Sequence, residues 1–432
     1  MIILIIEKMI FFNKNILKGE ILKNRIIVIS LAYVGVLTGA GLASGQELMQ
    51  YFIGFGKIGI IGIGIVGILH AIFGKIILTL GSYYRSKEHS GLLNEIAHPL
   101  VARLLDYSLV FTCFVIGFVM IAGAGANLNQ EFGIPSFVGA LICSLMIIFL
   151  SMLDFEKVTK IIGFFTPLIF LFIIIAFVYA FIMKSHDFSV VEMLAKKQPT
   201  NTPSIWIAIP NYFSICFITG TSMAIVMGGD IMNPKIASKS GLIGGALTGL
   251  LGLMIGFTIY AEIAEVSGTN IPTQIIIREI SPWLGLIMSL VIYGMIFNTG
   301  ISVYYSMAKR FSGESKRRFK IYIILLVSVG FALSFFGFKK LVGIMYPVLG
   351  YIGLLLLATM IAAWIKDKGN IKEEIKLRSR LLKLMIKKFD DNKIFTKKDQ
   401  KTINNLIEKS NIENKELKEE MRQLAKNKIE DK

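Results

Sequence analysis

The residues that could do chemistry gather in one short stretch, TGAGLASGQE, which runs from Thr38 to Glu47 inside an otherwise apolar segment. Three glycines fall within seven residues there: Gly39, Gly41 and Gly45. Glycine weakens a helix, so we expect the backbone to unwind at this point. Unwinding in a membrane frees N–H and C=O groups, and these need an ion, a solute or a side chain as partner. Close helix packing is the alternative reading of the glycines, but it leaves Gln46 and Glu47 unexplained.

An unwound helix offers both signs of charge to a ligand. Freed carbonyls around Gly39 and Ala40 can bind a cation, and the N–H groups that open the next half-helix at Gly45 and Gln46 can bind a carboxylate. Ser44 lies between these two positions and adds a hydroxyl. We therefore expect this stretch to form part of a solute site.

Glu47 needs a reason to lie in an apolar segment, because a carboxylate near the bilayer centre costs about 2.5–3.5 kcal/mol on insertion scales. One interpretation makes it a partner for a coupling proton or for the amine of a substrate. The other makes it a cap on the first turn of the outer half-helix, where its charge suits the helix dipole. Both interpretations stay open at this stage.

Polar side chains in three further apolar segments extend the predicted site. The substrate-binding set gains Asn127, Asn211, Thr219, Gly220, Thr221 and Ser222. A cation shell of oxygen atoms is expected from Asn298, Thr299 and Ser302 together with the carbonyls of Gly39 and Ala40, since hard cations prefer oxygen ligands. Hydroxyls in membrane helices also bond their own preceding carbonyls, which is the alternative for these residues.

Other chemistry has little support in the sequence. The four histidines and three cysteines show no metal-ligand spacing, so no metal is expected beyond a possible Na⁺. We find no phosphate-binding loop, redox cysteine pair or hydrolase motif, and therefore expect neither a cofactor nor an enzyme. The formal net charge of +17 comes from loops and the C-terminal region, so no nucleic-acid partner is expected.

The elements that must position these residues are membrane helices. The 432-residue chain is 54% hydrophobic and 17% charged, whereas soluble proteins carry about 25% charged residues. The hydropathy pattern predicts ten spans: 26–54, 58–80, 106–128, 134–153, 158–183, 204–229, 238–261, 283–307, 319–336 and 341–364. Lys and Arg are more frequent on one side of this arrangement, which predicts a multi-pass protein of the cytoplasmic membrane with both termini inside.

The ten predicted spans fall into two sets of five with an offset of about 180 residues. Lys160, Gly163 and Pro167 correspond to residues 340, 343 and 347, which are again Lys, Gly and Pro, and Gly39 aligns with residue 220. Five is an odd number, so the second set must enter the membrane from the other side. We predict an all-α fold with a 5+5 inverted repeat, in which spans one and six are discontinuous.

The domain boundaries follow from this pattern. We expect an N-terminal cytoplasmic or interfacial segment (1–25), a first repeat (26–183), a second repeat (204–365) and a basic helical tail (366–432). We interpret the tail as a cytosolic appendage that is solvated or lies on anionic lipid. A regulatory role is the alternative.

The first span also resembles a known family. Ala32-Tyr33-Val34-Gly35 followed by the stretch from Gly39 to Glu47 is similar to the opening of YkvI-type bacterial membrane proteins, and so are Ala122–Gly125, Phe132–Pro135 and Tyr346-Pro347. The resemblance covers most of 25–365. This family is similar to the amino acid–polyamine–organocation (APC) superfamily, whose members share the LeuT fold. The resemblance implies a site between spans one, three, six and eight, and a sodium-type site with Thr299 and Ser302. Asn298 stands where a threonine would be expected.

The function expected from these features is secondary transport. The leading hypothesis is cation-coupled symport, with Na⁺ or H⁺, of an amino acid or a similar small zwitterionic or organic solute across the lipid bilayer. The alternative is a sensor or receptor subunit on a transporter scaffold, for example of the spore-germinant type, which binds a small solute without net transport.

Overall fold

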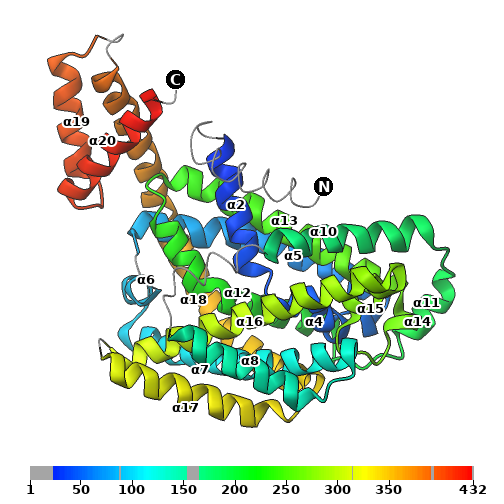
Figure 1. Cartoon of the computed structure of the whole chain (residues 1–432). Coiled ribbons are helices and arrows are strands. Elements are labelled where there is room, and N and C mark those ends of the chain that lie inside the picture. Colours follow the sequence, from blue (N-terminus) through cyan, green and yellow to red (C-terminus); the bar gives the residue numbers. More distant parts are fainter. Residues whose placement is uncertain (1–22, 87–88, 153–164, 314, 391–393, 431–432) are drawn as a thin grey trace.

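The computed structural model describes residues 23–86, 89–152, 165–313, 315–390 and 394–430, and these are helical without any strand (Figure 1). Most of the predicted segment 1–25 lies outside the described residues. So does the start of predicted span five, 158–164, with Lys160 and Gly163 of the repeat pattern.

The first half of the described chain contains α2 (Lys23–Leu37), α3 (Ala40–Ser44), α4 (Gln46–Tyr51), η1 (Ile53–Phe55), α5 (Lys57–Tyr84), α6 (His89–Ile96), α7 (Pro99–Phe132), α8 (Ser136–Ser151), α10 (Phe165–Val178), the π-helical turn η2 (Tyr179–Met183) and α11 (Phe188–Ala195). The second half contains α12 (Ile205–Gly229), α13 (Pro234–Ala261), α14 (Ile263–Val266), α15 (Pro272–Ile280), α16 (Pro282–Ser312), α17 (Lys316–Ser334), α18 (Phe338–Phe389), α19 (Lys397–Lys409) and α20 (Asn414–Glu430).

Each predicted span coincides with one or more of these helices. Six helices within the described residues are long and apolar enough to cross a membrane: α5, α7, α12, α13, α16 and α18. Three shorter apolar stretches, in α2, α8 and α10, lie beside them. The chain is therefore an all-helical, multi-pass membrane protein, as the hydropathy pattern predicts.

Two groups of helices make up the bundle. In the first, α5 packs along α13 and α12, and α2 packs on α13 and α12. In the second, α7 packs on α16 and α8, and α17 packs on α16, α7 and α8. Two helices connect the groups, because α10 contacts both α13 and α16, whereas α18 contacts both α12 and α7.

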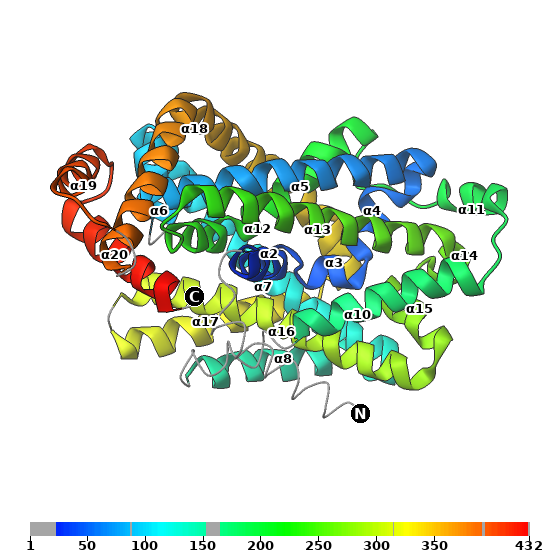
Figure 2. The same ribbon diagram turned by 90° about the horizontal axis from the view of Figure 1, so that it is seen from above.

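The bundle has two distinct ends in Figures 1 and 2. One carries α6, α19 and α20 and is called the tail end below. The other carries α11, α14 and α15 and is called the loop end. Helices α5 and α12 run from the loop end to the tail end, and α13 runs back.

The prediction of a discontinuous span six is wrong, because α12 is one uninterrupted helix. The hydroxyl groups of its polar cluster form hydrogen bonds with carbonyls of the same helix. Thr219 Oγ1 donates to the carbonyl of Cys216 at 2.9 Å, and Thr221 Oγ1 donates to that of Phe217 at 2.6 Å. A single glycine, Gly220, lies between them and packs against the side chain of Leu37. One glycine with two internally bonded threonines does not unwind a helix.

Glycines set the closest helix contact in the bundle, between α5 and α13. Gly241, Gly245 and Gly249 recur every four residues and so lie on one face of α13. A Cβ on Gly245 would overlap the carbonyl oxygen of His70, and one on Gly249 would overlap the backbone of Gly67. The backbones can approach this closely only because these positions lack side chains, as in other membrane helix pairs.

We predict that Gly245→Ala destabilises the protein by about 1–3 kcal/mol, because the added methyl forces two long helices apart. Gly252→Ala on the same helix is the matched control, since a Cβ there makes only an ordinary contact with Ile63. Thermal unfolding in detergent measures both. Equal midpoints for the two variants would contradict the steric argument.

The tail is not a free appendage. Helix α18 continues without a break across the predicted boundary at residue 365 and ends at Phe389. Its last turns form a small apolar core with α19 and α20, to which Met232 contributes from the loop between α12 and α13. The apolar residues that the sequence placed at helical spacing, such as Leu381 and Met385, thus face protein instead of lipid.

A buried arginine fixes the tail to the rest of the bundle. Arg378 is 0% exposed and its guanidinium donates to the carbonyls of Ser82 (2.9 Å), Met232 (3.0 Å) and Tyr83 (3.1 Å). It also donates to Glu374 at 2.6 Å on its own helix and to Asn411 at 2.9 Å beyond α19. The ends of α5 and α12 are therefore attached to α18, which is joined in turn to the residues after α19.

We predict that Arg378→Ala costs about 3–5 kcal/mol and releases the tail, because it leaves Glu374 buried without its cation and three carbonyls without their donor. Limited proteolysis in detergent should then cleave α19 and α20 from the membrane part. The control is Arg380→Ala, two residues further on at an exposed position. If the two variants resist protease equally, the buried network does not hold the tail.

Candidate solute site

The first span is broken where the sequence predicted. Helix α2 ends at Leu37, α3 begins at Ala40, and Gly39 between them is extended (φ −68°, ψ 175°). The Thr38 amide and Oγ1 both donate to the carbonyl of Val34 at 2.8 Å, so this threonine closes the end of α2. The expectation of an unwound segment is confirmed.

A second interruption follows at Gly45, whose φ of 76° is a left-handed conformation that suits glycine. Side chains satisfy the backbone around it. Ser44 Oγ donates to the carbonyl of Gly41 at 2.8 Å and accepts from the amide of Gln46 at 3.2 Å. Thr273 Oγ1, from α15, donates to the carbonyl of Ala43 at 2.6 Å. The region between the two breaks is thus held by protein groups.

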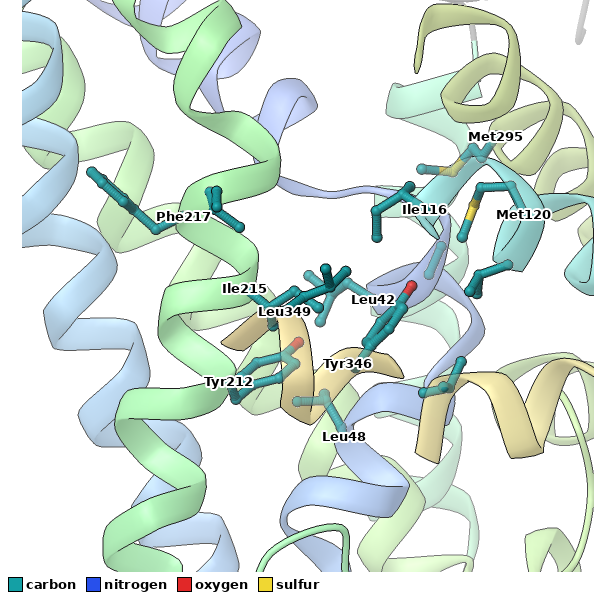
Figure 3. Packing of buried hydrophobic residues seen from close by; sticks show 14 of the residues in the cluster. Leu42, Leu48, Ile116, Met120, Tyr212, Ile215, Phe217, Met295, Tyr346 and Leu349 are labelled. Carbon is teal, nitrogen blue, oxygen red and sulfur yellow. The ribbon is translucent and has the colours of Figure 1, made fainter. Parts of the chain in front are cut away.

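A cavity of about 80 Å³ lies beside this break, between the two groups of helices. Several waters or a small solute fit in such a volume, since one water needs about 10–15 Å³ by the same measure. Its wall is mostly apolar and includes Leu42, Leu48, Ile116, Met120 and Ile215. Figure 3 shows these side chains converging with Tyr212 and Tyr346 around the broken helix.

The cavity is closed at one side and open at the other. Near Glu47, the aromatic residues Tyr51, Phe52, Tyr212 and Tyr346 are buried. Farther along α12 toward the tail end, Cys216 is partly exposed and Thr219 is exposed. The opening therefore faces the tail end.

Five of the predicted site residues line this cavity: Gly39, Gly41, Glu47, Thr219 and Thr299. The break thus brings together α3, α4, α12 and α16, as the sequence suggested. Two members of the predicted cation set, Gly39 and Thr299, are among these five. The Thr299 hydroxyl donates to the carbonyl of Met295 on its own helix at 3.1 Å.

Other predicted residues lie outside the cavity. Ser44, Gly45 and Gln46 face protein, as do Asn127, Asn211, Gly220 and Thr221. Ser222, Asn298 and Ser302 do not line the cavity either. The side chain of Ala40, from the predicted cation set, lies outside the described part of the chain. Asn211 accepts from Tyr51 and donates to the carbonyl of Pro347, both at 2.9 Å, so its amide joins α12 to α4 and α18. Asn127 accepts from Ser289 at 3.0 Å. Ser302 donates to Asn298 at 3.4 Å, which keeps both side chains within α16.

Glu47 is the acidic side chain of the cavity. It is 8% exposed, and its Oε2 accepts a hydrogen bond from the Tyr212 hydroxyl at 3.2 Å. The Tyr346 hydroxyl bonds the same carboxylate from α18. The other oxygen, Oε1, lies against Gly41, where a Cβ would overlap it. The carboxylate therefore lies against α3 across the second interruption of the first helix, at Gly45.

Sequence reasoning missed Tyr212, Tyr346, Cys216 and His70 as residues of the site. His70 does pack edge-on against Phe213, with ring centroids 5.1 Å apart, but it also lines the cavity. Tyr346 directly precedes the helix proline Pro347, and Tyr212 follows the helix proline Pro210 by two residues. That proximity was the one local signal for them.

A charged cluster joins helices at the loop end. Lys184 Nζ lies 2.6 Å from Glu262 and 2.7 Å from Glu279, and His186 Nε2 lies 3.0 Å from Glu262. Burial lowers the pKa of Lys184, but its hydrogen bonds to the two glutamates outweigh that effect and raise it above its ordinary value. The amine thus stays charged and ties the segment after η2 to the end of α13 and to α15.

Metal binding finds no support in the described residues, which hold no group of three His, Cys, Asp or Glu side chains.

Comparison with known proteins agrees with the resemblance seen in the sequence. No known family model matches the chain. Two uncharacterized proteins of Bacillus subtilis (strain 168) are homologous to it. The membrane protein YkvI is 21% identical over 336 residues, which cover 77% of this chain and 94% of YkvI. YyaD is 23% identical over 333 residues, which cover 77% of this chain and 94% of YyaD.

Two solved transporter structures have a similar fold. The inward-facing conformation of Mhp1 aligns with a TM-score of 0.54 at 11% identity and covers 81% of this chain and 77% of Mhp1. A manganese transporter of Eremococcus coleocola aligns with a TM-score of 0.50 at 13% identity and covers 94% and 95% of the two chains. Both have the LeuT fold, so the predicted fold relationship is confirmed.

We predict that Gly41→Ala disturbs the site, whereas Gly39→Ala does not. A methyl on Gly41 displaces the Glu47 carboxylate and weakens its bond to Tyr212, at a cost of about 1–3 kcal/mol. A methyl on Gly39 meets nothing within 4 Å, and alanine adopts its backbone angles readily. Thermal unfolding of the two variants in detergent checks this, and a loss of stability in Gly39→Ala as large as in Gly41→Ala would refute it.

Proposed function

We propose, for this homologue of the YkvI and YyaD membrane proteins, secondary active transport of a small solute through the cavity at the break in the first helix. One observation carries the proposal. The cavity lies between the two groups of helices, with α5, α12 and α13 on one side and α7 and α16 on the other. A site between two such groups can be exposed alternately to the two sides of the membrane when the groups move.

The mirrored packing of the helices supports a 5+5 inverted repeat of ten spans. Helix α5 packs on α12, and its counterpart α13 packs on α2. Helix α7 packs on α8, and its counterpart α16 packs on α17. Helix α10 packs on α13 and α16, and its counterpart α18 packs on α5 and α7. We propose that in this arrangement the tail end faces the cytoplasm and both termini lie on the cytoplasmic side of the cell membrane.

An amino acid or similar small zwitterionic or organic solute, carried with Na⁺ or H⁺, is the cargo we propose. The cavity has the size and mixed character for it, with an apolar wall, one carboxylate and the hydroxyls of Thr219 and Thr299. Gly39 and Thr299, two of the ligands expected for a coupling cation, both line this cavity. Coupled transport of this kind is symport.

A sensor without net transport is the second candidate, because the tail is a docked domain that a partner protein could recognise or displace. Such a protein would bind solute in the same cavity. It differs from a transporter only in the absence of flux.

We expect Cys216→Trp to lower uptake at least tenfold, because the indole fills the cavity from α12. Cys113→Trp is the matched control, a partly exposed cysteine on α7 outside the cavity. Radiolabelled amino acids are offered to proteoliposomes under a Na⁺ gradient and under a pH gradient. Each variant is compared with the wild-type chain and with empty liposomes.

The outcomes separate the hypotheses. Uptake that Cys216→Trp blocks and Cys113→Trp leaves intact supports transport through this cavity. Thermal stabilisation by a solute without uptake or counterflow favours the sensor. Equal uptake in both variants would place the route elsewhere in the protein.

A further inference from the structure

Glu47 lacks the partner that a buried carboxylate normally has. Its two hydrogen-bond donors are the phenols of Tyr212 and Tyr346. Among the described residues that line the cavity there is neither lysine nor arginine. Ion pairs within the described ranges lie at the two ends of the bundle, for example Lys184 with Glu262 and Arg378 with Glu374, and none includes Glu47.

An ionised carboxylate in such a place is unfavourable. Two neutral hydroxyls reduce the desolvation cost but supply no positive charge, and buried charges in proteins are normally paired. The first helix could have carried glutamine at this position and kept both hydrogen bonds. The carboxylate therefore acquires its positive partner from outside the chain.

The surrounding groups favour a proton over a metal cation in that role. A hard cation needs several oxygen ligands at once. Among the side chains expected to provide them, Thr299 bonds Met295, and Ser302 bonds Asn298 outside the cavity. Next to Glu47 itself the neighbours are hydroxyls that donate to it. A proton needs only the carboxylate and the water-sized space of the cavity.

Proton uptake would also change how three helices are joined. An ionised carboxylate only accepts hydrogen bonds, whereas a protonated one also donates. Tyr212 and Tyr346 hold the carboxylate to α12 and α18, and Oε1 rests against the first turn of α3 at Gly41. A change at Glu47 is therefore felt on both sides of the break.

We propose that Glu47 is the ion-coupling residue of this protein and that the ion is a proton, which enters from the open side of the cavity. Proton binding at Glu47 does not depend on the proposed transport function. The statement that it drives solute movement rests on the proposed transport function.

The other titratable groups around the carboxylate are few. Tyr51 lies on the same helix, Tyr212 and Cys216 on α12, Tyr346 on α18, and His70 faces the cavity from α5. Of these, only His70 can become positively charged. A His70→Gln variant therefore identifies any contribution from the imidazole.

Infrared difference spectroscopy on the full chain in lipid films tests the proposal without a solute. Lowering the pH should produce a protonated-carboxyl C=O band that Glu47→Gln removes and that Glu265→Gln, at an exposed position, retains. Glu47→Asp should move the band instead of deleting it, which covers a Gln variant that fails to fold. Tyr212→Phe should raise the midpoint pH of the band by about one to two units, because the lost bond favours the ionised form.

Each of the following results tests one part of the proposal. A band that persists in Glu47→Gln, or that is lost in His70→Gln instead, overturns the assignment to Glu47. Loss of the band when NaCl replaces choline chloride at constant pH shows that Na⁺ takes the site. Amino-acid uptake driven by Na⁺ but not by a pH gradient, without a Glu47 band, overturns proton coupling and leaves transport standing. A Glu47 band without proton flux for any amino acid overturns transport and leaves the proton site standing.

Discussion

The interruption of the first helix is the constraint on which the rest of the structure depends. Backbone groups freed inside a membrane must find partners there, because no water reaches them from the lipid. Here Thr38, Ser44 and Thr273 satisfy part of that requirement, and the left-handed Gly45 lets α4 start in a new direction. The new direction places the Glu47 carboxylate over Gly41 and leaves a cavity beside the break. The cavity thus results from the way in which side chains form hydrogen bonds with the freed backbone groups.

The frame around the break is built in two different ways. Along α5 and α13, glycines bring two backbones into direct contact, so these helices can move only as a unit. At the tail end, a single arginine side chain connects α18 with the ends of α5 and α12 through hydrogen bonds to carbonyls. The first kind of contact is continuous and apolar, whereas the second is local and polar. A local polar contact is the easier of the two to separate, which makes the tail the more adjustable part.

Local features of the sequence could be predicted and pairings between distant segments could not. Hydropathy located the helices, and glycine density located the break at Thr38–Gly39. Span six was predicted wrongly because Thr219 and Thr221 look the same in sequence whether they line a gap or bond their own helix. Tyr212 and Tyr346 stand far from Glu47 in the chain, so their meeting depends on how α4, α12 and α18 cross. The burial of Arg378 has the same origin, since no local pattern distinguishes it from the exposed Arg380.

The two ends of the bundle differ in their charged contacts. This difference bears on how the cavity could be reached from the loop end. At the loop end, Lys184 joins Glu262 and Glu279, and Glu192 of α11 accepts from Tyr260 at 2.6 Å and from the amide of Lys57 at 2.9 Å. These contacts connect α5, α13 and α15 above the buried tyrosines. Opening on that side must break ion pairs that water and ions can replace, because Glu279 and Lys184 are partly exposed. The buried tyrosines, which lie behind these ion pairs, can then separate when their helices move. The loop-end ion pairs and the buried tyrosines therefore both separate Glu47 from that side of the bundle.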